Sequence, residues 1–186
     1  RGLTSIERYL NEWMPKFGAA GRLWSTFDIG VDYIEATYPE AFTAAGLQNI
    51  GALPDGKDMM TDTPRQNSAI TRAFFSDKVH HSAVRWINWM TPEGLSFEHS
   101  DLILSRASEK AIVRLWGPRM AKLDAILRML SDRGFAETAG SYPNFNAQLT
   151  PKFLTGRPQF TAGEVSGDRI VCSLRYTVEV GFSRLT

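Results

Sequence analysis

The stretch that decides the predicted fold spans residues 111–134 and reads AIVRLWGPRMAKLDAILRMLSDRG. Its first six residues alternate with the period of a β-strand, and two of them are β-branched, so they predict a strand. A Gly-Pro pair ends this run, and Pro118 suits the first position of a helix because its φ is already helical. The helix predicted after it ends at the final glycine and carries one apolar stripe, formed by Met120, Leu123, Ile126, Leu127 and Leu130. We expect this stripe to pack on the sheet face that carries Val113 and Leu115.

The rest of the second half predicts two hairpins around this helix. Residues 101–106 form a short predicted strand, and 107–110 turn it back into the strand described above. Three prolines mark residues 135–158 as an irregular connection. A second hairpin follows, with strands at 159–165 and 169–182. The last strand has an apolar face in a fixed register, formed by Ile170, Cys172, Leu174, Tyr176, Val178, Val180 and Phe182.

The first half has more varied patterns. Its predicted elements are, in order, an amphipathic helix over 4–17, a strand over 27–33, a short helix over 39–45 closed by Gly46, a loop over 51–68 and a turn over 91–94. Between residues 69 and 90 the period does not separate strand from helix. A strand there would place Ala83, Arg85, Ile87 and Trp89 on one face.

These patterns together predict one α+β domain over residues 1–186, with a small, mostly antiparallel sheet flanked by helices. We expect its core in residues 96–186, as hairpin, helix and hairpin. Residues 1–95 are expected to form an elaborated N-terminal part.

The composition is that of a soluble globular protein. With 186 residues, 43% hydrophobic and 22% charged, the chain can bury a core without disulfides. A net charge of +1 excludes a global field that would draw it to nucleic acid or an anionic membrane. No apolar run approaches the ~20 residues of a membrane helix, and the start has no signal-peptide layout. Because the chain starts at Arg1 rather than Met, we expect a start that was processed, trimmed or placed at an ordered part.

The single cysteine, Cys172, lies within the predicted last strand. A cysteine without a partner in the chain fits a reducing compartment and a small buried apolar group. A reactive thiol is the alternative.

The sequence has no set of residues that predicts catalysis, a metal site or a cofactor site. A zinc site needs at least three convergent ligands, whereas the adjacent His80 and His81 diverge on a strand or a helix. No serine lies in a nucleophile-elbow pattern, and there is no phosphate loop or dinucleotide fingerprint. Asp28 and Asp32 would share a strand face as an acid–base pair, but solvent exposure explains them better. We therefore predict no catalytic, metal-binding or cofactor-binding residues and no enzyme activity.

Residues 65–89 interleave basic and aromatic side chains, namely Arg65, Arg72, Phe74, Lys78, Arg85, Trp86 and Trp89. Such a pattern is typical of surfaces that bind single-stranded nucleic acid. Acidic residues dilute the charge, however, and core aromatics beside solvated charges explain the pattern better. A nucleic-acid-binding module stays as an alternative function.

The segment IVRLWGPRMAKLDAILRML, residues 112–130, resembles the strand, Gly-Pro pair and amphipathic helix of tail terminator proteins of tailed bacteriophages, also called tail completion or neck proteins. The strand-to-helix match is carried by Ile112, Val113, Leu115, Trp116, Gly117 and Pro118, and the helix by Ala121, Leu123, Ile126 and Leu130. The closing segment RIVCSLRYTVEVGFSRL, residues 169–185, is similar to the long final strand of that group.

This resemblance implies a structural virion protein, a ring subunit that caps the tail tube and joins it to the head connector. It implies a small sheet of mixed topology flanked by helices, with no catalytic residue and no cofactor. The implied partners are further copies in a ring of six, the tail tube or sheath protein and the head–tail connector protein. Nucleic acid would only pass through the ring lumen. The implied location is the tail or neck of the virion, after assembly in the host cytoplasm; another neck, connector or baseplate component is the alternative.

The long final strand supplies the predicted contact between subunits. Its length of 14 residues over 169–182 exceeds that of ordinary strands, so part of it is expected to present an unpaired edge. The residues expected in this interface are Arg175, Val178, Glu179, Val180 and Phe182. A head-to-tail contact repeated by rotation closes into a ring.

Overall fold

The structure is a computed structural model. It describes residues 16, 30–63, 68–116, 128–136, 138, 147–152, 154, 156 and 158–185, without the side chains of 147–149, 178 and 181–185. In chain order, the elements are α3 (Val31–Thr37), α4 (Glu40–Ala44), β1 (Ile50–Met60), α5 (Ser68–Phe74), β2 (Phe75–Ser76), β3 (His81–Met90), β4 (Ser96–His99), β5 (Ile103–Leu104), α6 (Glu109–Trp116), β6 (Arg128–Leu130), the 3₁₀ helix η2 (Arg133–Phe135), β7 (Ala147–Leu149) and α7 (Ala162–Leu185). The predicted α+β class is confirmed.

The sheet is built around β1 and β3. Its strand order is β2-β3-β1-β6-β7, and β4 and β5 also pair with β3. β1 and β3 form a long antiparallel ladder from Leu53↔Met90 to Met60↔Ala83. β6 is parallel to β1, and β7 is parallel to β6. The sheet is therefore mixed, with its antiparallel part around β3.

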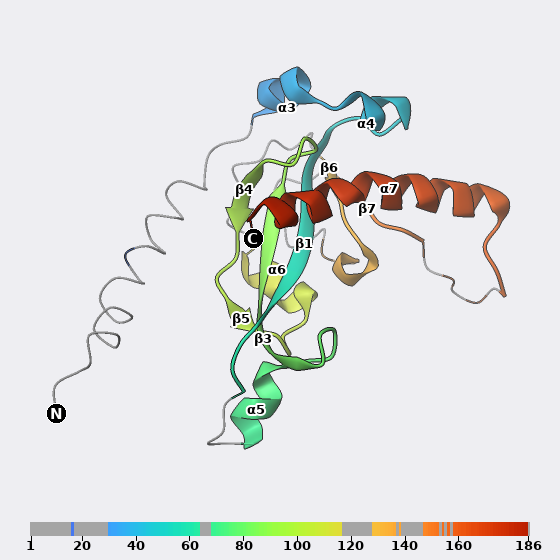
Figure 1. The fold of residues 1–186 in the computed structure, drawn as a ribbon. Helices are drawn as coiled ribbons and strands as arrows, with labels where there is room; N and C mark the ends of the chain where they lie inside the picture. The colour runs from blue at the N-terminus through green and yellow to red at the C-terminus, as the bar shows by residue number, and fades with distance from the viewer. Residues whose placement is uncertain are drawn as a thin grey trace.

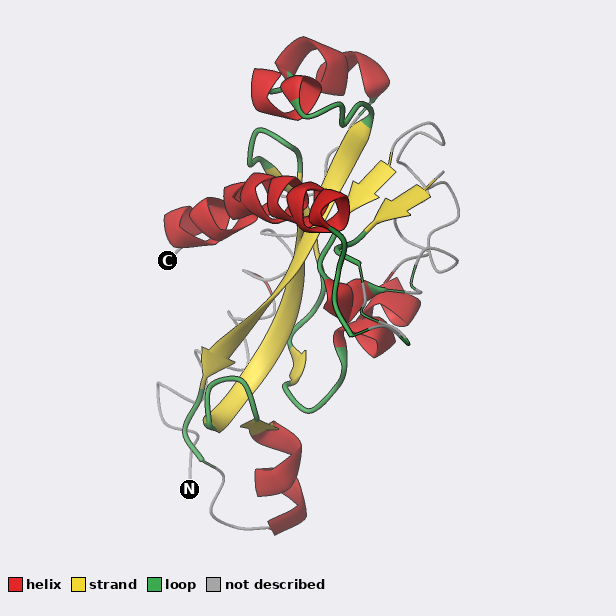
Figure 2. Ribbon diagram, turned by 90° about the vertical axis from the view of Figure 1, so that its right-hand side faces the viewer, coloured by secondary structure: helices red, strands yellow, loops and turns green. Residues whose placement is uncertain are grey.

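Helices cover both faces of this sheet. α7 crosses β1 and β3 on one side and α6 lies on the other, with α3 and α4 at one end of the sheet and α5 at the opposite end (Figure 1 and Figure 2). The core on the α6 face contains Ile34, Ala52, Ile87, Trp89, Phe97, Ile112, Val113, Trp116, Met129 and Phe135. The core on the α7 face contains Phe42, Ile50, Leu53, Met90 and Leu130, with Val171 and Leu174 of α7 packed against it. Both halves of the chain thus supply buried residues.

The prediction of a strand over 111–116 is wrong, because α6 occupies Glu109–Trp116. Its buried residues Ile112, Val113 and Trp116 recur at helical spacing, while Leu115 is 69% exposed. Ser108 caps the helix, with its side-chain oxygen accepting a hydrogen bond from Ala111 N at 3.2 Å. A run of eight residues can match both the strand period of two and the helical period of 3.6, and here the Ser108 cap favours the helix. The predicted hairpin is therefore absent, and β5 pairs with β3 instead.

The prediction of a helix after the Gly-Pro pair is also wrong in the part that the structure describes. Residues 117–127 lie outside the described residues, but Arg128–Leu130 form β6 beside β1. Met129 and Leu130 are fully buried. Gly134, the predicted end of the helix, lies within η2.

The loop predicted over 51–68 is wrong for most of its length, because β1 is a central strand. The prediction of a loop was based on residues such as Pro54 and Gly56, yet a strand accommodates both of them here. Beyond Ala52, β1 pairs only with β3 among the described strands, so Pro54 can lack an N–H without breaking a second ladder. Gly56 lies against the carboxylate of Glu109 on α6.

The C-terminal hairpin is replaced by α7, a helix of 24 residues. Thr161 and Glu164 form a reciprocal capping box at its start, with Thr161 N donating to Glu164 Oε2 at 2.9 Å and Glu164 N to Thr161 Oγ1 at 3.3 Å. Its inward residues Val171 and Leu174 follow helical spacing. Cys172 is exposed rather than buried in a strand. Residues 96–186 thus do not form the predicted hairpin, helix and hairpin.

The remaining predictions have mixed outcomes. The short helix over 39–45 is confirmed as α4, and Gly46 closes it at φ 71°. Residues 81–90, where the sequence left strand and helix open, form a strand, and the predicted turn follows it. Residues 31–33 belong to helix α3 instead of a strand, and the connection over 135–158 contains β7. The helix over 4–17 lies outside the described residues except for the helical Lys16.

Candidate functional site

Charged side chains meet where β1, α6, β6 and α7 approach one another. Asp55 lies on β1, Glu109 at the start of α6 and Asp132 just after β6. Arg175 of α7 reaches the two aspartates, with its Nη2 3.6 Å from Asp55 Oδ1 and 3.7 Å from Asp132 Oδ2. We call Asp55, Glu109 and Asp132 the carboxylate cluster.

Two glycines leave the space that Glu109 fills. A Cβ atom at Gly56 would lie 2.5 Å from Glu109 Oε1, and one at Gly134 would clash with Glu109 Oε2. Gly134 N also donates a hydrogen bond of 2.7 Å to Asp132 Oδ1. The packing of α6 against β1 and η2 thus depends on residues without a side chain at both positions.

Burial raises the pKa of two residues in the carboxylate cluster, Asp55 and Glu109. It raises the pKa of Asp55 above its usual range, against the opposing charges of Arg175 and Lys78, and the nearby Asp132 adds to the rise. Burial likewise raises the pKa of Glu109, with repulsion from Asp132 as the next cause. Folding therefore favours the protonated form of Asp55 and Glu109.

A separate ion pair, between Asp58 of β1 and Arg85 of β3, joins two residues that lie opposite each other in the ladder. Arg85 donates to Asp58 through Nε at 2.6 Å and Nη2 at 2.9 Å, and Ser76 Oγ donates to the same carboxylate. Burial opposes the charged form of Asp58, but the hydrogen bonds from Arg85 and Ser76 outweigh it and hold the pKa of Asp58 below its usual range. This pair ties together three strands.

These charges are arranged to hold the fold. Among the described residues, no group of histidine, cysteine, aspartate and glutamate is placed to hold a metal ion. Arg175 instead connects α7 to Asp55 of β1 and to Asp132, two residues after β6. We interpret Asp55 and Asp132 as the polar part of the contact that anchors α7 on the sheet, and Glu109 as part of the packing of α6 against β1 and η2.

The outward side of α7 carries a second feature. Val165, Arg169, Cys172 and Tyr176 follow at i, i+4, i+7 and i+11, so they share one face of the helix. All four are exposed, with Val165 at 39% and Tyr176 at 62%. We call these four residues the outer stripe.

An apolar row crosses the end of the sheet that α7 does not cover. Met59, Val84 and Leu104 are direct neighbours across β1, β3 and β5, and Phe75 on β2 pairs with Ser82, two residues from Val84. The four side chains therefore lie on the α7 face. Met59 is 47% exposed, Leu104 41% and Phe75 38%. We call Met59, Phe75, Val84 and Leu104 the sheet end.

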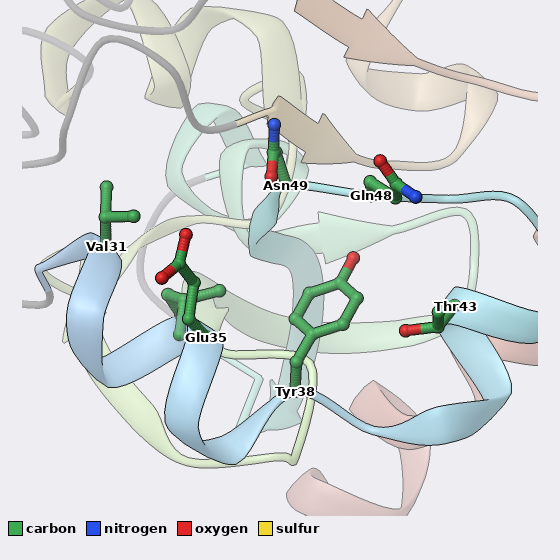
Figure 3. A pocket seen from close by; sticks show the side chains of 7 residues that line it. Val31, Glu35, Tyr38, Thr43, Gln48 and Asn49 are labelled. Atoms are coloured by element: carbon green, nitrogen blue, oxygen red, sulfur yellow. The ribbon is translucent and has the colours of Figure 1, made fainter.

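A pocket of about 240 Å³ lies between α3, α4 and the start of β1. In Figure 3, Glu35 and Tyr38 are directed towards the segment that carries Gln48 and Asn49. The Tyr38 hydroxyl donates to Leu47 O at 2.7 Å and accepts from Ile50 N at 3.1 Å, and burial raises its pKa. This hydroxyl therefore holds the segment before β1 and is already occupied by backbone partners.

The predicted interface residues take several positions. Arg175 faces its own sheet, Glu179 is exposed and Val180 is half-buried on α7. The side chains of Val178 and Phe182 lie outside the description. Sequence reasoning missed the outer stripe and the sheet end because it assigned the wrong period to 169–182 and a loop to 51–68.

The other candidate residues are dispersed. His80 lies in the turn before β3, His81 at its start and His99 at the end of β4. Asp32 is exposed on α3, and Asp28 lies outside the described residues. In the basic and aromatic stretch, Trp89 is buried and Arg85 is paired with Asp58, whereas Arg65 is not described.

Comparison with known proteins adds no assignment. No protein family model, curated protein or solved structure matches this chain. Among the described residues, no helix combines the length and apolar character needed to cross a membrane.

Proposed function

We propose that this protein is a structural subunit that assembles with copies of itself into a ring. The single observation that carries the proposal is the sheet end, where apolar side chains from four strands lie together and three of them, Met59, Phe75 and Leu104, are exposed, while Val84 is half-buried. Contiguous apolar surface of this kind marks sites of protein–protein contact. Asp55 and Asp132 bind Arg175 of α7, and Glu109 packs between α6, β1 and η2, so all three carboxylates have partners inside the subunit.

The biological setting follows from the sequence resemblance. We propose a ring in the neck or tail of a phage virion that joins the tail tube to the head connector. The two segments that carry the resemblance form α6, β6 and α7 here, so this setting is supported by the residue patterns and by the mixed sheet with flanking helices, and not by matching element types. Another neck, connector or baseplate component is the alternative.

A nucleic-acid-binding module receives less support. Of the residues that suggested it, Trp89 is fully buried and the guanidinium of Arg85 is held by two bonds to Asp58. Neither side chain is positioned to stack on a base or contact a phosphate.

The test is the native mass of the purified protein, measured by light scattering and sedimentation over a range of concentrations. We expect a closed species of several subunits, whose ring shape electron microscopy can verify. A protein that remains monomeric at every concentration would overturn the proposal.

A matched pair of variants connects the assembly with the sheet end. Leu104→Glu introduces a charge at the sheet end and should lower the native mass. Leu115→Glu is the control, because Leu115 is an exposed leucine on α6, on the opposite side of the sheet. Equal effects of both substitutions would assign the contact to another surface.

A further inference from the structure

We propose that α7 is a releasable cover on the sheet, held closed while the Asp55 carboxyl carries a proton and loosened when this carboxyl ionises. The helix would then respond to pH as a unit, while the sheet beneath it stays folded. The inference concerns the subunit itself and holds whether or not the subunit assembles.

α7 is attached to the sheet with little burial. α6 buries Ile112, Val113 and Trp116 within eight residues. α7 has 24 residues, yet none of its described side chains is fully buried. Its apolar contact with the core on this face comes from Val171 and Leu174, which are only partly buried. Because so little apolar area holds the helix, the charges at its contact have a large share in the balance between a closed and an open state.

Asp55 lies under α7 without a hydrogen bond from the helix. Its side chain is 18% exposed, and Arg175 Nη2 is 3.6 Å from Asp55 Oδ1, which is longer than an ordinary hydrogen bond. The same nitrogen is shared with Asp132, at 3.7 Å. Arg175 Nε is buried and has no hydrogen-bond partner among the described residues. The guanidinium thus attracts the Asp55 carboxylate without donating to it.

The neighbouring strand does not compensate this carboxylate either. Asn88 of β3 lies directly opposite Asp55 in the ladder and is fully buried. Its Oδ1 accepts a hydrogen bond from Ser96 Oγ at 2.6 Å, whereas its Nδ2 has no hydrogen-bond partner in the described part of the chain. An ionised carboxyl under a helix is costly unless hydrogen bonds or close opposite charges replace its water. The geometry around Asp55 therefore favours the neutral form while α7 is in place.

The charged groups around Asp55 oppose one another. Two are positive and two are negative, namely Arg175 of α7, Lys78 of the turn after β2, Asp132 after β6 and Glu109 at the start of α6. Burial is the largest influence, and it raises the pKa of Asp55 from its usual 3.8. Release of α7 would return water to this carboxyl, so its pKa would fall back towards the usual value.

The direction of the pH dependence follows from this difference in pKa. The closed state binds the proton of Asp55 more tightly than the open state does. Closing is therefore most favoured below the usual pKa of 3.8 and is weakened as the pH rises through the raised pKa. Because one proton is released, the closing equilibrium constant falls by at most about tenfold per pH unit.

Release would uncover an apolar part of the sheet and disorder the helix. The core on the α7 face includes the fully buried Ile50, Leu53, Met90 and Leu130. A single helix in water is marginally stable without packing of its apolar side. α7 also contains several glycines and β-branched residues, which have low helix propensity. Opening should therefore appear as a loss of amide protection within α7.

Hydrogen exchange followed by mass spectrometry measures this release on the purified full chain. Rates are recorded between about pH 5 and about pH 9 and corrected for the intrinsic effect of pH on exchange. We expect peptides from α7 to lose protection as the pH rises, by up to about tenfold per unit, while peptides from β1 and β3 keep theirs. The native mass at each pH separates release of α7 from dissociation of an assembly.

Three variants identify the group that titrates. Asp55→Asn places a neutral side chain of similar shape under α7 and should keep the helix protected across the whole pH range. Asp32→Asn, at an exposed position of α3, is the matched control and should retain the wild-type slope. Leu174→Ala removes an apolar contact and no titrating group, so it should lower the protection of α7 at every pH and leave the slope unchanged.

Other results would overturn the inference. If α7 and the sheet lose protection together, α7 has no separate release. If the slope survives in Asp55→Asn, or disappears in Glu109→Gln alone, another group holds the proton. If the protection of wild-type α7 is constant or rises with pH, the ionised Asp55 is compensated in the closed state. This last measurement needs no variant, so it decides the question even if Asp55→Asn fails to fold.

Discussion

Removal of Asp58 tests whether residues 50–60 form a central strand. Asp58 accepts two hydrogen bonds from Arg85, at 2.6 and 2.9 Å, and its side chain is 1% exposed against 14% for Arg85. Breaking a buried pair by removing one partner costs about 3–5 kcal/mol. We expect Asp58→Ala to cost about 3 kcal/mol, at the low end, because Arg85 Nη1 keeps a bond of 3.3 Å to Ala107 O.

The reverse substitution completes a thermodynamic cycle. Arg85→Ala leaves the carboxylate of Asp58 buried with Ser76 as its remaining donor, so a cost of about 3–4 kcal/mol is expected. The double variant should be more stable than the sum of the two losses predicts, by about 2–3 kcal/mol. Because the pKa of Asp58 is lowered, this coupling is present at neutral pH and should be lost as the pH falls well below about 4.

Urea unfolding at pH 7 followed by circular dichroism measures all four proteins. Costs that add within about 0.5 kcal/mol would show that the two side chains do not interact in solution. Costs below about 0.5 kcal/mol for each variant would match an exposed loop and refute the placement of β1.

Three further expectations concern the carboxylate cluster and α6. Folding raises the pKa values of Asp55 and Glu109, so the folded state holds their protons more tightly than the unfolded state does. Urea midpoints should therefore fall as the pH rises above about 4, and Asp55→Asn should flatten that slope. Midpoints that rise with pH in this range would contradict the expectation. Gly56→Ala should cost about 1–3 kcal/mol in urea unfolding, and a Glu109→Ala background should remove most of this cost; an unchanged cost would refute the close contact. Val113→Ala should cost about 2 kcal/mol and Leu115→Ala under about 0.5; similar losses would favour a strand, where the two share a face.

The sequence was informative where local signals agreed with one another. The short helix α4 follows Pro39 and closes at Gly46, and both residues act within the element itself. At β3 the alternation of Ala83, Arg85, Ile87 and Trp89 allowed a strand but did not exclude a helix, and the structure has the strand. The α+β class follows because some segments of the sequence have the helical period and others have the strand period.

Long-range pairing decided the elements that were predicted wrongly. A loop was predicted for β1 from its Gly and Pro, yet β3 supplies a partner for each residue from Leu53 to Met60. No local pattern shows that Gly56 will face Glu109 on α6. The missed helices did carry local signals, because Ser108 caps α6 and the Thr161–Glu164 capping box begins α7. Caps should therefore have outweighed alternation in these apolar runs.

The same reasoning explains why the candidate surfaces were not visible in the sequence. The sheet end exists only because β1, β2, β3 and β5 meet there, and none of the pairings between these strands was predicted. The outer stripe appears only when residues 165–176 are read with the helical period. A list of exposed residues from the predicted strand would have mixed the inward Arg175 with the outward Glu179.

The way α7 is held gives association a structural consequence. A helix gains most of its stability in a protein from the elements that cover its apolar side. In the subunit alone, α7 has Val171 and Leu174 in the core on its sheet face and Arg175 between two aspartates, while the outer stripe stays exposed. A neighbour on that stripe would cover the remaining apolar side and leave the internal contacts unchanged. Under the proposed self-assembly, a partner that covered this stripe would therefore stabilise α7, so that association and the ordering of α7 would reinforce each other.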